Sequence, residues 1–123
     1  MIGGLIEVIL YVEDMEKQVS FYRDILGLEV LYPAGAERYD KEMWVTIDTG
    51  PCVLALHGGG RKRLGADTPK IVFGVEDIEA ARDLLLERGL ELGEIRNAAP
   101  GVYVCDGFDP EGNPLSIESH GSQ

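Results

Sequence analysis

The sequence has few of the residues that mark secreted, membrane-spanning or nucleic-acid-binding proteins. Its two cysteines, Cys52 and Cys105, form no C-x-x-C pair, so we expect reduced, buried thiols in a cytoplasmic protein. The 11 Lys and Arg residues against 22 Asp and Glu give a net charge of -11, which argues against nucleic acid as a partner because phosphate contacts need clustered cations. No apolar run approaches the roughly 18 residues that a membrane helix requires. The acidic excess favours solubility or a cationic ligand.

The residues that are present indicate one folded domain. A chain of 123 residues, 45% of them hydrophobic, can build a single core, and we expect one domain over residues 1–123. The apolar start, MIGGLIEVIL, has no basic leader and is interrupted by Glu7, so it predicts a first strand rather than a secretion signal.

The second half of the chain resembles the first. VEDMEKQVSFYRDILGLEV at residues 12–30 is followed by VEDIEAARDLLLERGLELG at residues 75–93. Aligning Glu7 with Lys70 superimposes EVILYVEDME on KIVFGVEDIE without a gap. Such self-similarity predicts two like modules, roughly residues 1–60 and 66–120.

The later part of each half aligns as well. IDTGPCVLALH lies over FDPEGNPLSIE, which places Asp48 on Asp109 and Ala55 on Ser116. The two halves therefore have matching positions on their first and last strands.

Each half shows the signals of a capped helix. Asp14 and Asp77 suit the N-cap position, where a carboxylate accepts from a free backbone N–H. Gly27 and Gly89 match after one deleted residue and suit the left-handed position that ends a helix. Between these signals, apolar residues recur at helical spacing: Met15, Val19, Tyr22 and Leu26, then Ile78, Ala81 and Leu85.

Around each helix the sequence predicts four strands, which gives the order βαβββ twice in an α+β fold. One such unit leaves a face of its sheet bare and buries too little surface to be stable alone. Two units are therefore expected to cover each other, or to form a ligand cavity with cupped mixed sheets. The expected strands are Leu5–Val12, Leu28–Tyr32, Met43–Asp48 and Cys52–His57, then Lys70–Val75, Glu91–Arg96, Val102–Phe108 and Pro114–Ser119.

These features resemble the vicinal oxygen chelate superfamily of glyoxalases, bleomycin-resistance proteins and extradiol dioxygenases. The resemblance rests on V-E-D at Val12–Asp14, S-F-Y leading to L-G-L at Ser20–Leu28, and D-P-E-G-N at Asp109–Asn113. It covers almost the whole chain and identifies a fold more than a chemistry. It implies paired βαβββ modules, a homodimer and a ligand cavity in each cupped sheet.

In metal-dependent members of that superfamily, a divalent ion is held by side chains from the first and fourth strand of each module. The resemblance maps these positions to Glu7, Ala55, Lys70 and Ser116. Ala55 and Ser116 supply no good ligand, and a lysine ammonium has no acceptor. Because a catalytic metal site needs about three protein ligands, we expect no metal at these positions and no cofactor.

Glu7 and Lys70 are candidates for another role, because they hold equivalent places in the two modules. They are expected to form an ion pair, to hold a polar ligand group, or to act as a catalytic acid and base. The competing interpretation is that both lie at strand ends and point into water.

A displaced metal site is the alternative. His57 lies two residues past Ala55, and Glu118 lies two past Ser116, so each shares a strand face with a family position. Together with Glu7 they would suit zinc, nickel, iron or manganese. The interpretation that we favour is that His57 begins the following loop and faces solvent.

Three other features have simpler interpretations. GGGRKR, residues 58–63, lacks the G-K-[ST] ending of a phosphate loop and is interpreted as a flexible link, although its cations would suit an anionic group. DPEGNP, residues 109–114, predicts a tight turn. The aromatic candidates for a cavity wall or for the core are Trp44, Tyr11, Tyr39 and Tyr103.

Two functions fit these observations. The first is a metal-free module that binds a small molecule in an apolar cleft. The second is a divalent-metal-dependent lyase or dioxygenase, glyoxalase I-like, with displaced ligands. We favour the first because the usual ligands are missing, and we expect neither nucleic acid nor membrane as a partner.

Overall fold

The computed structural model describes residues 5–59 and 69–121. The chain divides into two compact units, Met1–Arg63 and Leu64–Gln123, and each is described by itself. The proposed link at Gly58–Arg63 falls largely outside the described residues. Within the described ranges, no helix has the length and hydropathy needed to cross a lipid bilayer.

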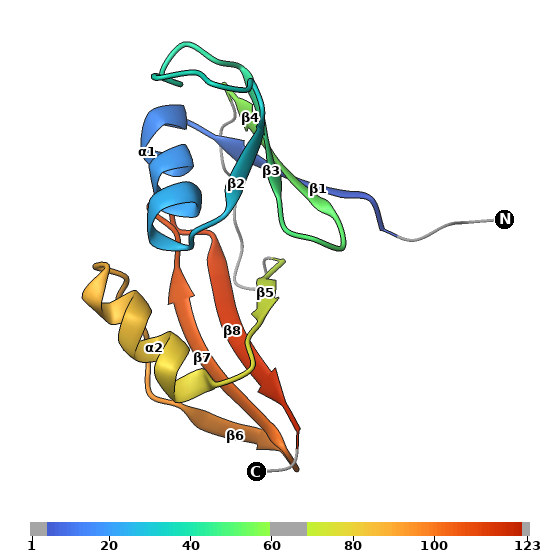
Figure 1. Ribbon diagram of the computed structural model, residues 1–123, viewed down its shortest axis with the longest axis vertical. Helices are drawn as coiled ribbons and strands as arrows, with labels where there is room; N and C mark the ends of the chain where they lie inside the picture. The colour runs from blue at the N-terminus through green and yellow to red at the C-terminus, as the bar shows by residue number, and fades with distance from the viewer. Residues whose placement is uncertain (1–4, 60–68, 122–123) are drawn as a thin grey trace, which may run out of the picture. The chain divides into compact units, whose positions relative to one another are not determined.

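The first unit is a four-stranded mixed sheet with one helical segment (Figure 1). Its strands lie in the order β1-β4-β3-β2, with β1 parallel to β4 and the other neighbours antiparallel. Its elements are β1 (Glu7–Val12), α1 (Met15–Ser20), η1 (Phe21–Ile25), β2 (Glu29–Tyr32), β3 (Trp44–Asp48) and β4 (Val53–Gly58).

The second unit repeats this plan, with the strand order β5-β8-β7-β6 and β5 parallel to β8 (Figure 1). The predicted α+β class and the order βαβββ in each half are therefore confirmed. Its elements are β5 (Ile71–Gly74), α2 (Ile78–Glu87), β6 (Arg96–Ala99), β7 (Val102–Phe108) and β8 (Pro114–His120).

The strand registers show that the first and last strands of the two sheets are equivalent. Val8 lies opposite Leu54 across β1 and β4, and Ile71 lies opposite Leu115 across β5 and β8. The alignment that places Glu7 on Lys70 and Ala55 on Ser116 also matches Val8 with Ile71 and Leu54 with Leu115, so the two registers agree with it.

The hairpins between the last two strands of each unit differ by one residue. Asp48 pairs with Val53 across residues 49–52, whereas Phe108 pairs with Pro114 across residues 109–113. Asp48 is therefore the counterpart of Phe108, and its predicted match with Asp109 is wrong. The extra residue lies in the turn, where an ungapped alignment cannot place it.

Both predicted N-caps are confirmed. The Asp14 carboxylate accepts from the backbone N of Lys17 at 3.0 Å, and the Asp77 carboxylate accepts from Ala80 N at 3.1 Å. Each bond satisfies one of the backbone donors that a helix leaves free at its start.

The first helical segment ends in a π-helical turn that the apolar spacing does not predict. The terminal glycine lies 13 residues after the N-cap in the first segment (14 to 27) and 12 residues after it in the second (77 to 89). The extra residue widens η1, where Leu26 N donates to Phe21 O over five residues. Both segments then stop at the predicted glycines, Gly27 (φ 76°) and Gly89 (φ 96°).

The strand predicted at Glu91–Arg96 is wrong, because β6 is Arg96–Ala99. Leu92 and Ile95 are three residues apart, a spacing that does not keep both on one face of a strand. The residues of β6 are all exposed and include no large apolar side chain, so periodicity could not locate them. The side chain of Asn97 fixes the turn by donating to the carbonyls of Ala99 and Val102.

The predicted turn DPEGNP is confirmed. The Asp109 carboxylate accepts from the backbone N of Glu111 and of Asn113, both at 2.9 Å. Gly112 has a φ of 86°, in the left-handed region that glycine adopts without strain.

The core of each unit lies between its sheet and its helical segment. Alternate strand residues on this face are almost fully buried, which leaves the opposite face of each sheet partly bare. Buried strand residues on this face include Val45, Ile47, Leu54 and Leu56 in the first unit, and Cys105, Leu115 and Ile117 in the second.

Candidate functional site

The face of the first sheet opposite α1 is named the first open face. It carries three rows of side chains across β1, β4 and β3. The rows are Tyr11, His57 and Trp44; then Ile9, Ala55 and Thr46; then Glu7, Val53 and Asp48.

The first of these rows is aromatic. The His57 ring lies 5.2 Å from the Tyr11 ring and 5.9 Å from the Trp44 ring, centroid to centroid. The Nδ1 atom of His57 lies 2.8 Å from the carbonyl of Gly58, so Nδ1 carries a proton and, in the neutral ring, Nε2 is left as an acceptor. His57 is half-buried and belongs to β4, so its interpretation as an exposed loop residue is wrong.

The other predicted site residues of the first unit lie further along the same face. Ala55 is fully buried in the middle row, and Glu7 is half-buried in the last. Glu7 is four residues along the strands from the His57 row, about 13 Å at the usual strand rise. The structure thus places His57 and Trp44 together and Glu7 apart from them.

The matching face of the second sheet, named the second open face, carries an ionic cluster around Asp106. The Asp106 carboxylate accepts from Ser116 Oγ at 2.5 Å, from Lys70 Nζ at 3.1 Å and from Arg96 Nη2 at 3.0 Å. Ser116 and Asp106 are register partners on β8 and β7. The hydrogen bond from Ser116, followed by those from Arg96 and Lys70, lowers the pKa of Asp106 to about 2.

The remaining candidates of the second unit are also paired. Glu118, half-buried on β8, lies with its carboxylate 2.5 Å from the Nε2 atom of His120. Lys70 has Asp106 as a partner within its own unit. The pairing of Glu7 with Lys70, and the displaced metal site that would join Glu7 and His57 to Glu118, both connect the two units and stay predictions.

The residues at the four family positions do not fit a divalent ion. Ala55 has no ligating atom, the Lys70 ammonium has no lone pair, and Ser116 is a neutral hydroxyl that already donates to Asp106. Within residues 5–59 and 69–121, no group of three or more His, Cys, Asp or Glu side chains is placed to hold a metal ion.

Sequence reasoning missed Asp106 and Arg96. Asp106 lies within the correctly predicted strand Val102–Phe108, and strand pairing alone would have placed it opposite Ser116 had the hairpin length been known. Arg96 was assigned to the end of a strand, whereas it begins β6 and lies close enough to bind Asp106.

The other aromatic candidates lie away from the open faces. Tyr39 is buried, with Arg23 over its ring at 5.7 Å. Tyr103 is the register partner of Ser119, on the face of the second sheet that meets α2. Trp44 and Tyr11 alone among the four lie on an open face.

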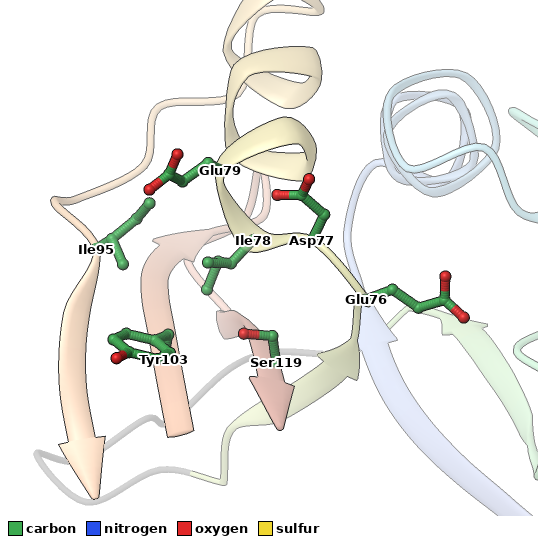
Figure 2. Close-up of a pocket in the computed structure, with 7 residues that line it drawn as sticks. All are labelled: Glu76, Asp77, Ile78, Glu79, Ile95, Tyr103 and Ser119. Carbon is green, nitrogen blue, oxygen red and sulfur yellow. The ribbon is translucent and has the colours of Figure 1, made fainter. Parts of the chain in front are cut away.

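A pocket of about 590 Å³ lies on the helix side of the second sheet (Figure 2). It is distinct from both open faces, because its strand residues point toward α2. Its lining comes from the start of α2 and the two residues before it, from the segment before β6, and from β7 and β8. The lining residues are Glu76, Asp77, Ile78, Glu79, Ile95, Tyr103 and Ser119.

Comparison with known proteins gives a consistent family match. A family model described as Glyoxalase/Bleomycin resistance protein/Dioxygenase superfamily matches residues 4–117. No curated protein matches the chain at a significant level.

Solved structures share the fold over nearly their whole length. The crystal structure of SMU.1112c is 25% identical, with a TM-score of 0.80, over 96% of this chain and 99% of that chain. Lactoylglutathione lyase from Agrobacterium tumefaciens is 19% identical, with a TM-score of 0.73, over 94% of this chain and 92% of its own. TnmS3, an antibiotic binding protein from Streptomyces sp. CB03234, is 21% identical, with a TM-score of 0.74, over 98% of each chain.

Proposed function

The chain belongs to the glyoxalase/bleomycin-resistance protein/dioxygenase superfamily, and on that premise we propose that it binds a small molecule with a planar ring, without a metal ion. The proposed site is the first open face. An enzyme and an antibiotic-binding protein both share this fold, so the fold itself does not select between catalysis and binding. The choice rests on the side chains.

The aromatic row is the observation that carries the proposal. Tyr11, His57 and Trp44 lie side by side across three strands, and the Tyr11 side chain is 53% exposed. Exposed aromatic rings offer a large apolar contact area at low cost in side-chain entropy. The Nε2 acceptor of His57 gives the row one directional contact, which suits a ring that carries a donor.

The chemistry of the family metal positions supports binding without a metal. Lys70 and Ser116 are engaged with Asp106, which is ionised at neutral pH. A divalent ion there would have to displace an ammonium and a hydroxyl that already satisfy the carboxylate. We therefore derive no catalytic step through a metal from these residues.

Apolar side chains on both open faces support the homodimer that the resemblance implies. Ile9 on the first face, and Val72 and Phe108 on the second, are 40–64% exposed. Association is the usual way to cover such side chains. Light scattering coupled to size exclusion should give twice the chain mass of 13.5 kDa, and the chain mass alone would contradict the dimer. A cytoplasmic location stays a prediction from cysteine content.

Trp44 makes the binding proposal directly testable, because it is the single tryptophan of the chain. Its fluorescence should be quenched in a saturable way by two- and three-ring aromatic compounds such as naphthalenemethanol, acridinium or anthracene carboxylate. His57→Ala and Tyr11→Ala should each weaken that binding about tenfold, as expected for loss of one stacking contact. Tyr103→Leu, which removes an aromatic ring from the other side of the other sheet, is the matched control and should leave the affinity unchanged. Quenching that does not saturate, or whose dissociation constant is unchanged by both substitutions, would contradict the proposed site.

A further inference from the structure

We propose that the second unit contains a separate binding site, the pocket between the first turn of α2 and the ends of β7 and β8, and that this site takes a small organic cation with an apolar body. The pocket volume, about 590 Å³, is in the usual range for small-molecule sites. This inference is independent of the proposed function, because the pocket faces α2 rather than an open face.

The pocket lies where the helix-facing side chain of β8 changes from isoleucine to serine. Further along the sheet, the helix-facing register pair is Cys105 with Ile117, and both residues are buried. Two positions on, the pair is Tyr103 with Ser119. The serine side chain is too small to fill the space below Ile78, so a hollow remains.

The corresponding place in the first unit carries a methionine and a glycine. Its register makes Met43 and Gly58 the counterparts of Tyr103 and Ser119, one residue before Trp44 and one after His57. A Cβ atom on Gly58 would lie 3.2 Å from the sulfur of Met43, and Gly58 N donates to Met43 O at 2.9 Å. The methionine sulfur thus lies against the strand at Gly58, whereas in the second unit Tyr103 and Ser119 both line the pocket.

A buried hydroxyl supplies the polar group of the pocket. Ser119 is only 2% exposed, and its hydroxyl forms no hydrogen bond with any residue of the described ranges. Figure 2 shows this hydroxyl pointing into the space beneath Ile78. A serine hydroxyl has two acceptor lone pairs, so it can accept a hydrogen bond from a donor on a ligand in the pocket.

The charge of the lining favours a cation. Glu76, Asp77 and Glu79 are its ionisable acids, and the lining includes no Lys or Arg. Arg82, one turn further along α2, is engaged with the carbonyl of Gly93 at 2.8 Å. An ammonium group could donate to Ser119 Oγ near the acidic rim, while an apolar body contacts the walls formed by Ile78, Ile95 and the Tyr103 ring.

Three probes of nearly equal size and different charge test this site. Benzylammonium added to ¹⁵N-labelled protein should shift the amide signals of Ile78, Tyr103 and Ser119 to saturation. Benzyl alcohol should bind at least about five-fold more weakly and benzoate not measurably, because only the cation complements the acidic rim. Shifts that do not saturate, that spread over the whole acidic surface, or that benzoate also produces would overturn the proposal.

Two variants separate the pocket from the surface charge. Ser119→Leu should fill the hollow and weaken benzylammonium binding at least about tenfold, with a dispersed spectrum showing that the chain still folds. Glu79→Gln should weaken benzylammonium binding about two- to five-fold, which is the range expected for an exposed charge pair. Glu87→Gln lies at the far end of α2 and makes the same change in net charge. It is the matched control and should have no effect on the binding. Equal effects of the two glutamine variants would overturn the pocket as the site. Trp44 fluorescence should not respond to the probe, which keeps this test separate from that of the first open face.

Discussion

Replacing Asp106 by Asn tests the ionic cluster that occupies the second open face. The substitution keeps the size of the side chain but removes the charge that Ser116, Arg96 and Lys70 contact. Lowering the pKa of the carboxyl from an ordinary 3.8 to about 2 corresponds to about 2.4 kcal/mol of stability if fully expressed. Since the Asp106 side chain is 42% exposed, solvent screening reduces the expected loss to about 1 kcal/mol at pH 7.

The sign of the pH dependence follows from the direction of the pKa change. A carboxyl with a depressed pKa in the folded state stabilises the protein fully above the unfolded value of 3.8, and this contribution is lost as pH falls from 3.8 toward 2. The difference in free energy of unfolding between the native chain and Asp106→Asn should therefore be largest at pH 7 and shrink below pH 3.8.

Urea unfolding at several pH values measures this difference. Asp83→Asn, an exposed acid on α2, is the matched control and should change the stability by less than about 0.5 kcal/mol. The reasoning is refuted if Asp106→Asn costs no more than the control at pH 7. It is equally refuted if the cost of Asp106→Asn stays constant down to the lowest pH at which both proteins fold.

Three further predictions concern the local structure. Asp77→Ala removes the carboxylate that caps Ala80 N and should lower the free energy of unfolding by about 1 kcal/mol, whereas Asp77→Asn should restore most of the loss; equal losses in urea titrations would contradict the cap. Gly107→Ala would place a methyl 2.9 Å from Glu91 O and should cost about 1–3 kcal/mol, while alanine at Gly74, which has no atom within 4 Å of its added Cβ, should cost less in the same assay. Burial raises the pKa of the Cys105 thiol, so a disulfide reagent at pH 8 should modify the half-buried Cys52 first; equal rates, resolved by mass spectrometry, would contradict the burial of Cys105.

Local chemistry in the sequence predicted most of the fold. Asp14 and Asp77 are N-caps and Gly27 and Gly89 are left-handed helix ends because those roles depend on a residue's own side chain, or on its lack of one. Strands with a buried face were predicted correctly because burial imposes alternation. The exposed strand β6 has no buried face, so nothing in its residues RNAA indicated a strand.

The candidate site was predicted less completely because it depends on register between strands. The alignment correctly matched Ala55 with Ser116, yet no pattern along the chain links Ser116 to Asp106 or Asp106 to Arg96. Those contacts depend on a hairpin that is one residue longer than its counterpart and on the true position of β6. The aromatic row has the same origin, since Tyr11, His57 and Trp44 come from three strands and are neighbours only in the folded sheet.

The metal dependence of ligand binding tests the central claim most directly. The measurement is a Trp44 fluorescence titration with a ring compound that binds, first on protein treated with a chelator and then with added zinc or manganese. The account predicts the same dissociation constant under both conditions, together with a loss of affinity in His57→Ala. Binding that appears only when the metal is present would contradict it.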